Sequence, residues 1–463
     1  MRRDQTARVR VSGNETKDTP SPSRDDEVVF RGGTILTIDP QHRVVTGDVA
    51  CLGGAIVQVG GDYTPRSRDY TIVDCAGCIV MPGLVQAHVH TCQTLARGRA
   101  DDMELLEWLR TVVWPYEAAL DEPAITASTE LACAELLLGG TTAILDMATV
   151  HHTDAVFAAA ARSGIRATIG KAMMDAPDPL IPPGLRESTR ASLDESAQLI
   201  QRWHGAADGR LRYAYAPRFV LSCTDELLRE VGDAARAAGV RIHTHASENQ
   251  GEIALVRQRF GKDNIAVLDE LGLLGDHCCI AHCVHLSGEE RRLLAARGAH
   301  VCHCPSSNLK LASGICPVPE LIAAGVGVAL GADGAPCNNN LDGFRELRLA
   351  ALLHKPRFGP RALPAPEVVR MATLGGAAAL GLADQIGSLE VGKRGDMIAV
   401  DVTALHTVPT ANPWSAIAYS AGGCDVRHVA VDGTLTVVDR ALRTLELPAV
   451  RDRARAAATR LFR

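Results

Sequence analysis

His88 and His90 are the first residues of the chain whose type and spacing could do chemistry. They lie in the apolar segment GLVQAHVHTCQTL (83–95), separated by one residue. Residues two apart on a β-strand point to the same face, so the two imidazoles would converge. Two imidazoles at one strand end are half of a metal site. The alternative is a pair of ordinary polar residues at a strand end, and only ligands elsewhere in the chain can decide.

Three further segments carry ionisable side chains after short apolar runs. They are His245 and Glu248 in RIHTHASE, His282 in CCIAHCVHL, and Asp333 in LGADGAPCNNN. Each residue alone has a structural interpretation, as a core histidine or a turn carboxylate. Together with His88 and His90 they could supply three imidazoles and a carboxylate and leave one position for water, which is typical of a catalytic metal site. The other histidines of these strands have no second feature and are expected to be structural: His243, His285, His300 and His303.

The residues with possible chemistry require elements that bring them together. Eight segments in the middle of the chain have the pattern of strands: 83–90, 141–147, 166–173, 211–218, 241–248, 278–286, 300–307 and 327–334. Helical patterns lie between them, such as 226–239, with Thr224 or Asp225 as the cap and Gly239 as the stop, and 287–298, between Ser287 and Gly298.

This alternation predicts an α/β fold with a (β/α)8, TIM-like barrel over residues 82–384. A doubly wound open sheet is the alternative, but it would carry a glycine-rich phosphate turn after its first strand, and HTCQTLARG is not one. In a barrel, the carboxyl ends of the strands meet at one mouth, so all the candidate residues would face the same space.

Both ends of the chain have a different pattern, with short β-type runs broken by glycine. We expect residues 28–81 and 385–447 to form one small β-sandwich domain, followed by a C-terminal helix over 448–463. Residues 1–27 are polar, with no apolar run after the first arginines, which predicts a disordered tail and no secretory signal.

Composition excludes some classes of function. The formal net charge of −6 gives no electrostatic reason to expect a nucleic acid or an anionic membrane as a partner. No apolar run reaches the roughly 18 residues that span a bilayer. The 14 cysteines are scattered through a long chain, many of them inside apolar runs, which favours free buried thiols and a cytoplasmic protein.

The segments PGLVQAHVH, THASE, AHCVHL, HCPSSNLKL and LGADGAPCNNNLDGFRELRLAALL resemble the amidohydrolase superfamily. The resemblance is to the branch that holds S-adenosylhomocysteine/methylthioadenosine deaminases, guanine deaminase and triazine hydrolases. It implies His88, His90, His245 and Asp333 as metal ligands, Glu248 as the proton shuttle, and His282 as a catalytic residue. Arg218, rather than a lysine, stands at the end of the fourth strand segment. One metal is therefore expected, zinc in preference to iron.

The resemblance implies hydrolytic deamination of a purine-type small molecule, with 5′-deoxyadenosine, methylthioadenosine or S-adenosylhomocysteine preferred. Guanine or another oxo-purine, an s-triazine, and a non-enzymatic barrel homologue are the alternatives. Three residues bear on the substrate: Glu117 for ribose hydroxyls, and Arg218 and Gln93 for a purine edge. A homo-oligomer, either a dimer or a tetramer, is expected by analogy, and the loop at 175–190 is expected over the barrel mouth.

Overall fold

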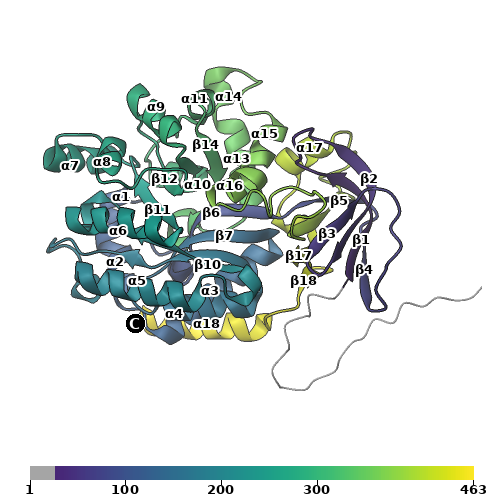
Figure 1. Cartoon of the computed structure of the whole chain (residues 1–463), viewed down its shortest axis with the longest axis horizontal. Coiled ribbons are helices and arrows are strands. Elements are labelled where there is room, and N and C mark those ends of the chain that lie inside the picture. The colour runs from purple at the N-terminus through teal and green to yellow at the C-terminus, as the bar shows by residue number, and fades with distance from the viewer. Residues whose placement is uncertain (1–26, 463) are drawn as a thin grey trace, which may run out of the picture.

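The computed structural model describes residues 27–462. The predicted tail lies outside these residues, except for Glu27, which is the first residue of strand β1. Two parts are visible in Figure 1: a barrel surrounded by helices, and a sheet at one side that contains strands from both ends of the chain. No helix within residues 27–462 is long and apolar enough to cross a membrane.

All eight predicted strand segments form strands of one parallel sheet. They are β6 (Leu84–His90), β7 (Thr141–Met147), β8 (Arg166–Gly170) with β9 (Ala172–Met173), β10 (Leu211–Pro217), β11 (Arg241–Ala246), β12 (Cys278–His282), β13 (His300–His303), and β14 (Gly327–Leu330) with β15 (Asp333–Gly334). The sheet closes on itself because β14 pairs with β13, whereas β15, three residues later, pairs with β6. The predicted barrel is confirmed.

Helices connect and cover the strands. They are α1 (Leu105–Trp108), α2 (Trp114–Ala118), α3 (Glu122–Leu138), α4 (Thr153–Ser163), α5 (Thr189–Trp203), α6 (Asp225–Ala238), α7 (Gln250–Phe260), α8 (Asn264–Glu270), α9 (Gly288–Arg297), α10 (Pro305–Lys310), α11 (Val318–Ala323), α12 (Ala335–Asn338), α13 (Gly343–Leu353), α14 (Lys355–Phe358), α15 (Ala365–Arg370), α16 (Gly376–Ala379), α17 (Pro413–Ser415) and α18 (Leu447–Leu461). Helix α18 packs against α3 beneath the barrel in the view of Figure 1.

The predicted helix ends are confirmed where the caps are local. Helix α6 begins after Thr224, whose hydroxyl accepts a hydrogen bond from the Leu227 amide, and ends at Gly239 with a φ of +64°. Helix α9 begins with a capping box between Ser287 and Glu290. These signals depend only on neighbouring residues, because each satisfies backbone groups that the helix itself leaves free.

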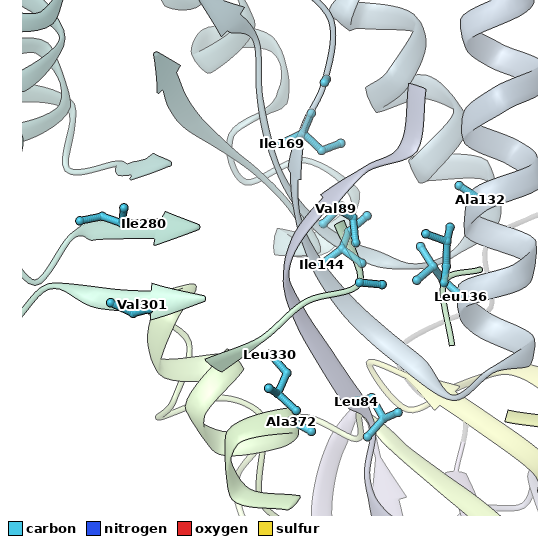
Figure 2. Packing of buried hydrophobic residues seen from close by; sticks show 14 of the residues in the cluster. Leu84, Val89, Ala132, Leu136, Ile144, Ile169, Ile280, Val301, Leu330 and Ala372 are labelled. Atoms are coloured by element: carbon cyan, nitrogen blue, oxygen red, sulfur yellow. The ribbon is translucent and has the colours of Figure 1, made fainter. Parts of the chain in front are cut away.

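The core lies between the strands and the surrounding helices. Figure 2 shows large aliphatic side chains of the strands, among them Leu84, Val89, Ile144, Ile169, Ile280, Val301 and Leu330, with Ala132 and Leu136 of α3 and with Ala372. The inner layer of the barrel contains smaller residues, including Ala87, Ala143, Ala214, Cys279, Cys302 and Ala329. An eight-stranded barrel encloses a space just wide enough for side chains to fill.

The alternation of inward- and outward-facing side chains along strand β6 is interrupted between Ala87 and His88. Val85 and Ala87 belong to the inner layer, whereas Leu84 and Val89 belong to the outer one. Regular alternation would keep odd-numbered residues on one face, so an irregularity must separate the two sets. The pairing of β6 with β7 does shift in register between Gln86 and Val89. This bulge turns both His88 and His90 toward the barrel interior.

The second sheet joins the two ends of the chain. Its strands are β1 (Glu27–Leu36), β2 (Val44–Leu52), β3 (Ala55–Val59), β4 (Tyr70–Asp74), β5 (Cys78–Pro82), β16 (Met397–Asp401), β17 (Val426–Val431), β18 (Thr434–Val438) and β19 (Ala441–Leu442). The order is β19-β18-β17-β16-β5-β1-β2-β3, with β4 beside β1. The antiparallel pair β5–β16 unites the early and late segments. The predicted domain boundaries at 81/82 and 384/385 stay predictions.

Candidate functional site

The predicted site residues meet at the carboxyl ends of the barrel strands. His90, His245, Glu248, His282 and Asp333 all line one cavity there. His88 lies beneath them and is completely buried. Polar side chains from β6, β11 and β12 and from β15 therefore converge on one space, as expected for the mouth of such a barrel.

Three imidazoles are held with their Nε2 atoms toward one another. The Nδ1 atom of His90 lies 2.8 Å from the Met147 carbonyl oxygen, and that of His245 lies 2.7 Å from the carbonyl oxygen of Arg218. A carbonyl accepts only, so both Nδ1 atoms carry the proton and both Nε2 atoms keep a lone pair. These two Nε2 atoms are 3.3 Å apart. Facing lone pairs at that distance favour a cation between them.

Asp333 completes this donor set. Its Oδ1 lies 3.2 Å from His88 Nε2 and 3.5 Å from His90 Nε2. The buried His88 Nε2 has no hydrogen-bond partner among the described residues. Two overlapping groups, His88-His90-His245 and His88-His282-Asp333, each hold their possible ligand atoms within 4.8 Å. Three nitrogen donors and one carboxylate oxygen fit a divalent metal.

The backbone around Asp333 is shaped for this contact. A Cβ on Gly331 would lie 2.6 Å from the carbonyl oxygen of His88, so only glycine allows the strand to approach β6 so closely. Asp333 itself has a φ of +63°, and His282 has a φ of +72°. Positive φ is uncommon for these residues and occurs where the surrounding structure holds a side chain in a required direction.

The two carboxylates of the site have opposite protonation tendencies. Burial would raise the pKa of Asp333, but His88 and His282 hold it well below its ordinary value. Burial raises the pKa of Glu248 to about 7. Ser307 donates a hydrogen bond to Asp333 Oδ2 at 2.6 Å. Asp333 is thus a carboxylate before the reaction, free to accept a proton, whereas Glu248 can gain or lose a proton near neutral pH.

His282 lies between these two carboxylates. Its Nε2 is 3.5 Å from Glu248 Oε2 and 3.9 Å from Asp333 Oδ2. Burial alone would lower the pKa of His282, but the two carboxylates together raise it. Its Nδ1 lies 2.9 Å from the side-chain oxygen of Asn308. That contact holds the ring with Nε2 toward the cavity.

By contrast, burial lowers the pKa of His90 to about 3 and lowers those of His88 and His245. Neutral imidazoles keep the lone pair that a metal ligand needs. The electrostatics of the site therefore agree with its geometry: three neutral histidines and one anionic aspartate.

Gln93, Glu117 and Arg218 form a cluster beside the cavity. The Arg218 guanidinium donates to both oxygens of Glu117, with Nη2 3.1 Å from Oε1, and Gln93 donates to the same Oε1 at 2.7 Å. All three are buried, and of the three only Arg218 lines the cavity. The cavity also has an apolar wall, which contains Leu105, Trp108, Leu109, Phe219 and Leu311.

The loop at 175–190 packs on this apolar wall. Ile181 and Leu185 belong to the same buried cluster as Trp108 and Leu109. The arginine at its end, Arg190, pairs with Asp194 and is 85% exposed, so it does not face the cavity.

Sequence reasoning missed several residues that contact the site. Ser307 and Asn308 lie in HCPSSNLKL, a segment used only for its resemblance. Asp146 accepts a hydrogen bond from the amide of Thr91, next to His90. His243, expected to be structural, has its Nε2 2.8 Å from His88 Nδ1. For His243 a signal was present, because His243 and His245 have the same spacing as His88 and His90.

Known proteins resemble the chain over nearly its whole length. A 5-methylthioadenosine/S-adenosylhomocysteine deaminase of Syntrophobacter fumaroxidans is 42% identical over 433 residues, which cover 93% of this chain and 97% of the relative. A 5′-deoxyadenosine deaminase of Methanosarcina acetivorans is 38% identical over 437 residues, 94% of this chain and 98% of its own. The crystal structure of an adenosine deaminase from Xanthomonas campestris with bound zinc superposes with a TM-score of 0.86, at 35% identity, over 95% of this chain and 99% of that one.

The family model described as "Amidohydrolase family" matches residues 79–436. This range contains the whole barrel and every metal-ligand candidate, together with Glu248 and His282. The predicted resemblance is confirmed, and the chain belongs to the amidohydrolase family.

Proposed function

We propose that this chain is a metal-dependent deaminase of adenosine-type nucleosides, with 5′-deoxyadenosine, methylthioadenosine or S-adenosylhomocysteine as substrate and ammonia as a product. The observation that carries the proposal is the set of three neutral imidazoles and one aspartate facing Glu248 and His282 across one cavity. The names of the relatives, which match over more than nine-tenths of the chain, support the substrate class.

His88, His90, His245 and Asp333 would hold one divalent metal. Zinc is preferred because the similar adenosine deaminase structure from Xanthomonas campestris contains bound zinc. Iron is the alternative, since nitrogen and oxygen donors bind both metals. When bound, the metal lowers the pKa of a coordinated water toward neutrality and so supplies a nucleophile.

The other steps belong to side chains of the chain. Asp333, which is anionic, orients the attacking water and accepts its proton. Glu248, with a pKa raised to about 7, carries a proton to the ring nitrogen beside the reacting carbon, which makes the C=N bond electrophilic. His282 donates a hydrogen bond from Nε2 to the attacking oxygen and stabilises the tetrahedral adduct. Asp333 then passes the proton it took from the water to the amino group, which leaves as ammonia, and the hydroxyl proton of the adduct returns to Glu248.

Substrate selection falls to the cluster of Gln93, Glu117 and Arg218 and to the apolar wall. The wall, with Trp108 and Phe219, suits a purine ring and an apolar 5′ group. Glu117 is chemically suited to accept hydrogen bonds from ribose hydroxyls. A second candidate function is deamination of guanine or another oxo-purine. It is favoured by Arg218, a donor-only side chain that lines the cavity, whereas Glu117, which accepts hydrogen bonds from both Nη atoms of the arginine, does not line it.

An ammonia-release screen separates these candidates. The zinc-loaded full chain would be assayed with adenosine, 5′-deoxyadenosine, methylthioadenosine, S-adenosylhomocysteine, guanine and melamine, alongside metal analysis. We expect about one zinc per chain and turnover of the adenosine compounds. Turnover of guanine alone would replace the first candidate by the second, and turnover of melamine alone would indicate a triazine hydrolase. Absence of bound metal from the wild-type chain would contradict the proposal.

Some expectations from the sequence remain proposals. We infer a homo-oligomer, either a dimer or a tetramer, which light scattering of the purified chain would test. We also infer a cytoplasmic enzyme that does not bind nucleic acid. The net charge of −6 supports the second inference, because a nucleic-acid partner selects for a basic surface.

A further inference from the structure

His243 lies directly beneath the candidate metal ligands, inside the barrel. It shares strand β11 with His245 two residues later, so both side chains point inward. Its Nε2 is 2.8 Å from Nδ1 of His88, and the two rings are nearly perpendicular, with centroids 4.9 Å apart. His243 is fully buried and does not line the cavity. It therefore touches a ligand candidate but cannot touch a substrate.

His88 differs from the other candidate histidine ligands in the group that accepts a hydrogen bond from its Nδ1. His90 uses the carbonyl of Met147, the last residue of β7, and His245 uses that of Arg218, just after β10. Both acceptors lie at the carboxyl ends of strands. His88 lies deeper, and its Nδ1 is directed at a side chain rather than at a carbonyl group. Within residues 27–462, the hydrogen-bond partner of His88 Nδ1 is the His243 side chain.

The proton positions of this pair follow from ligation. If His88 Nε2 gives its lone pair to a metal, the proton must lie on Nδ1, and Nδ1 must donate. Nε2 of His243 must then accept, which places the proton of His243 on its own Nδ1. That Nδ1 is buried and has no hydrogen-bond partner within residues 27–462. The barrel thus keeps a polar ring with one unsatisfied N–H in a layer of alanines and cysteines.

We propose that His243 is a positioning residue for the metal, acting as the neutral acceptor that holds His88 with its Nε2 lone pair toward the ligand site. The inference rests on the proposed metal site. If His243 only filled space, leucine would give a more stable protein at this position, because leucine leaves no buried N–H group without a partner. A partner that orients a ligand histidine has a measurable effect on metal affinity, typically 10- to 100-fold.

The experiment compares zinc affinity among three variants of the full chain, by competition with a chelating dye after metal removal. His243→Leu keeps the volume and removes the acceptor, and we expect a 10- to 100-fold increase in the zinc dissociation constant. His243→Gln keeps an acceptor oxygen near the position of Nε2, and we expect recovery of most of that loss. His303→Leu is the matched control, because His303 on β13 is equally buried and its ring makes no hydrogen bond with the described residues.

Equal zinc affinity in wild type and His243→Leu would overturn the inference, as would an equal loss in His243→Leu and His303→Leu. If wild type itself binds no zinc, the proposed function fails instead. Should His243→Leu not fold, neutron diffraction of the zinc-loaded wild type decides. Deuterium on Nδ1 of both His88 and His243 supports the assignment, and deuterium on His243 Nε2 overturns it.

Discussion

At the scale of single residues, the site separates two carboxylates that share one cavity. Asp333 faces His88 and His90 at 3.2 and 3.5 Å, which keeps it anionic. Glu248 lies 3.5 Å from His282 and 3.5 Å from the hydroxyl of Ser313, but burial outweighs these contacts and raises the pKa of Glu248 to about 7. When the surroundings of two carboxyl groups shift their pKa values in opposite directions, one group stays ionised and the other can transfer a proton. The roles proposed for these two residues follow from their surroundings.

This division predicts the behaviour of Glu248→Gln. The amide keeps the shape of the side chain but cannot carry a proton, so kcat should fall by about 10²- to 10⁴-fold, the usual contribution of a general acid–base group. Glu248 is not a ligand candidate, so the zinc content should stay near that of wild type. Steady-state kinetics and metal analysis would measure both. Glu226→Gln, an exposed residue of α6, is the control and should retain full activity. Near-wild-type turnover in Glu248→Gln would remove Glu248 from the mechanism.

At the scale of elements, strands and helices were predictable because their signals are local. Ser287 and Gly298 delimit α9 through contacts within a few residues. The proposed ligands could be grouped from the sequence because each lies within three residues of the carboxyl end of a barrel strand. The bulge that turns His88 inward was not predictable, since it depends on the register of β6 against β7. The contact between His88 and His243, 155 residues apart, likewise depends on barrel closure. Sequence spacing shows which residues share a strand but not which strands bring them into contact.

Asp146 links two of these elements and should make stability depend on pH. It is the penultimate residue of β7, is fully buried, and accepts hydrogen bonds from the amide and hydroxyl of Thr91, where the turn η1 (Thr91–Ala96) begins after His90. Burial raises its pKa to about 6. An unfolded aspartate has a pKa of about 3.9. The folded chain therefore holds this proton more tightly, and the resulting stabilisation is complete below about pH 4 and is lost as the pH rises toward 6.

Asp146→Asn removes this titration while keeping an acceptor for the Thr91 amide. The difference in the free energy of unfolding, wild type minus Asp146→Asn, should fall by about 2 kcal/mol as the pH rises from 4.5 to 7.5. Urea denaturation of the metal-free proteins at both pH values would measure the difference. Asp62→Asn, at an exposed position, is the control and should show a difference that does not change with pH. A relative stability of wild type that rises with pH would contradict the assignment.

At the scale of the whole molecule, Arg166 joins the barrel to the terminal sheet. It begins β8, at the end of the barrel opposite the site, and forms two hydrogen bonds with Asp396, of 2.7 and 2.8 Å, just before β16. Asp432, directly after β17, lies 3.4 Å away. The arginine and both carboxylates are almost completely buried. Burial alone would lower the pKa of Arg166, but the two carboxylates raise it, as expected for an arginine that stays charged.

Arg166→Met should therefore destabilise the molecule without changing its chemistry. It leaves the buried Asp396 without its arginine, whereas Asp432 keeps its pair with Arg394, and breaking a buried pair in this way costs about 3–5 kcal/mol. Arg190→Met is the control, because the Arg190–Asp194 pair is largely exposed and such pairs contribute less than about 1 kcal/mol. Urea unfolding would compare the two, and kcat per zinc-loaded chain should stay at the wild-type value in both, since Arg166 lies far along β8 from the mouth. If Arg166→Met costs no more than Arg190→Met, the Arg166–Asp396 pair does not stabilise the contact between the barrel and the sheet.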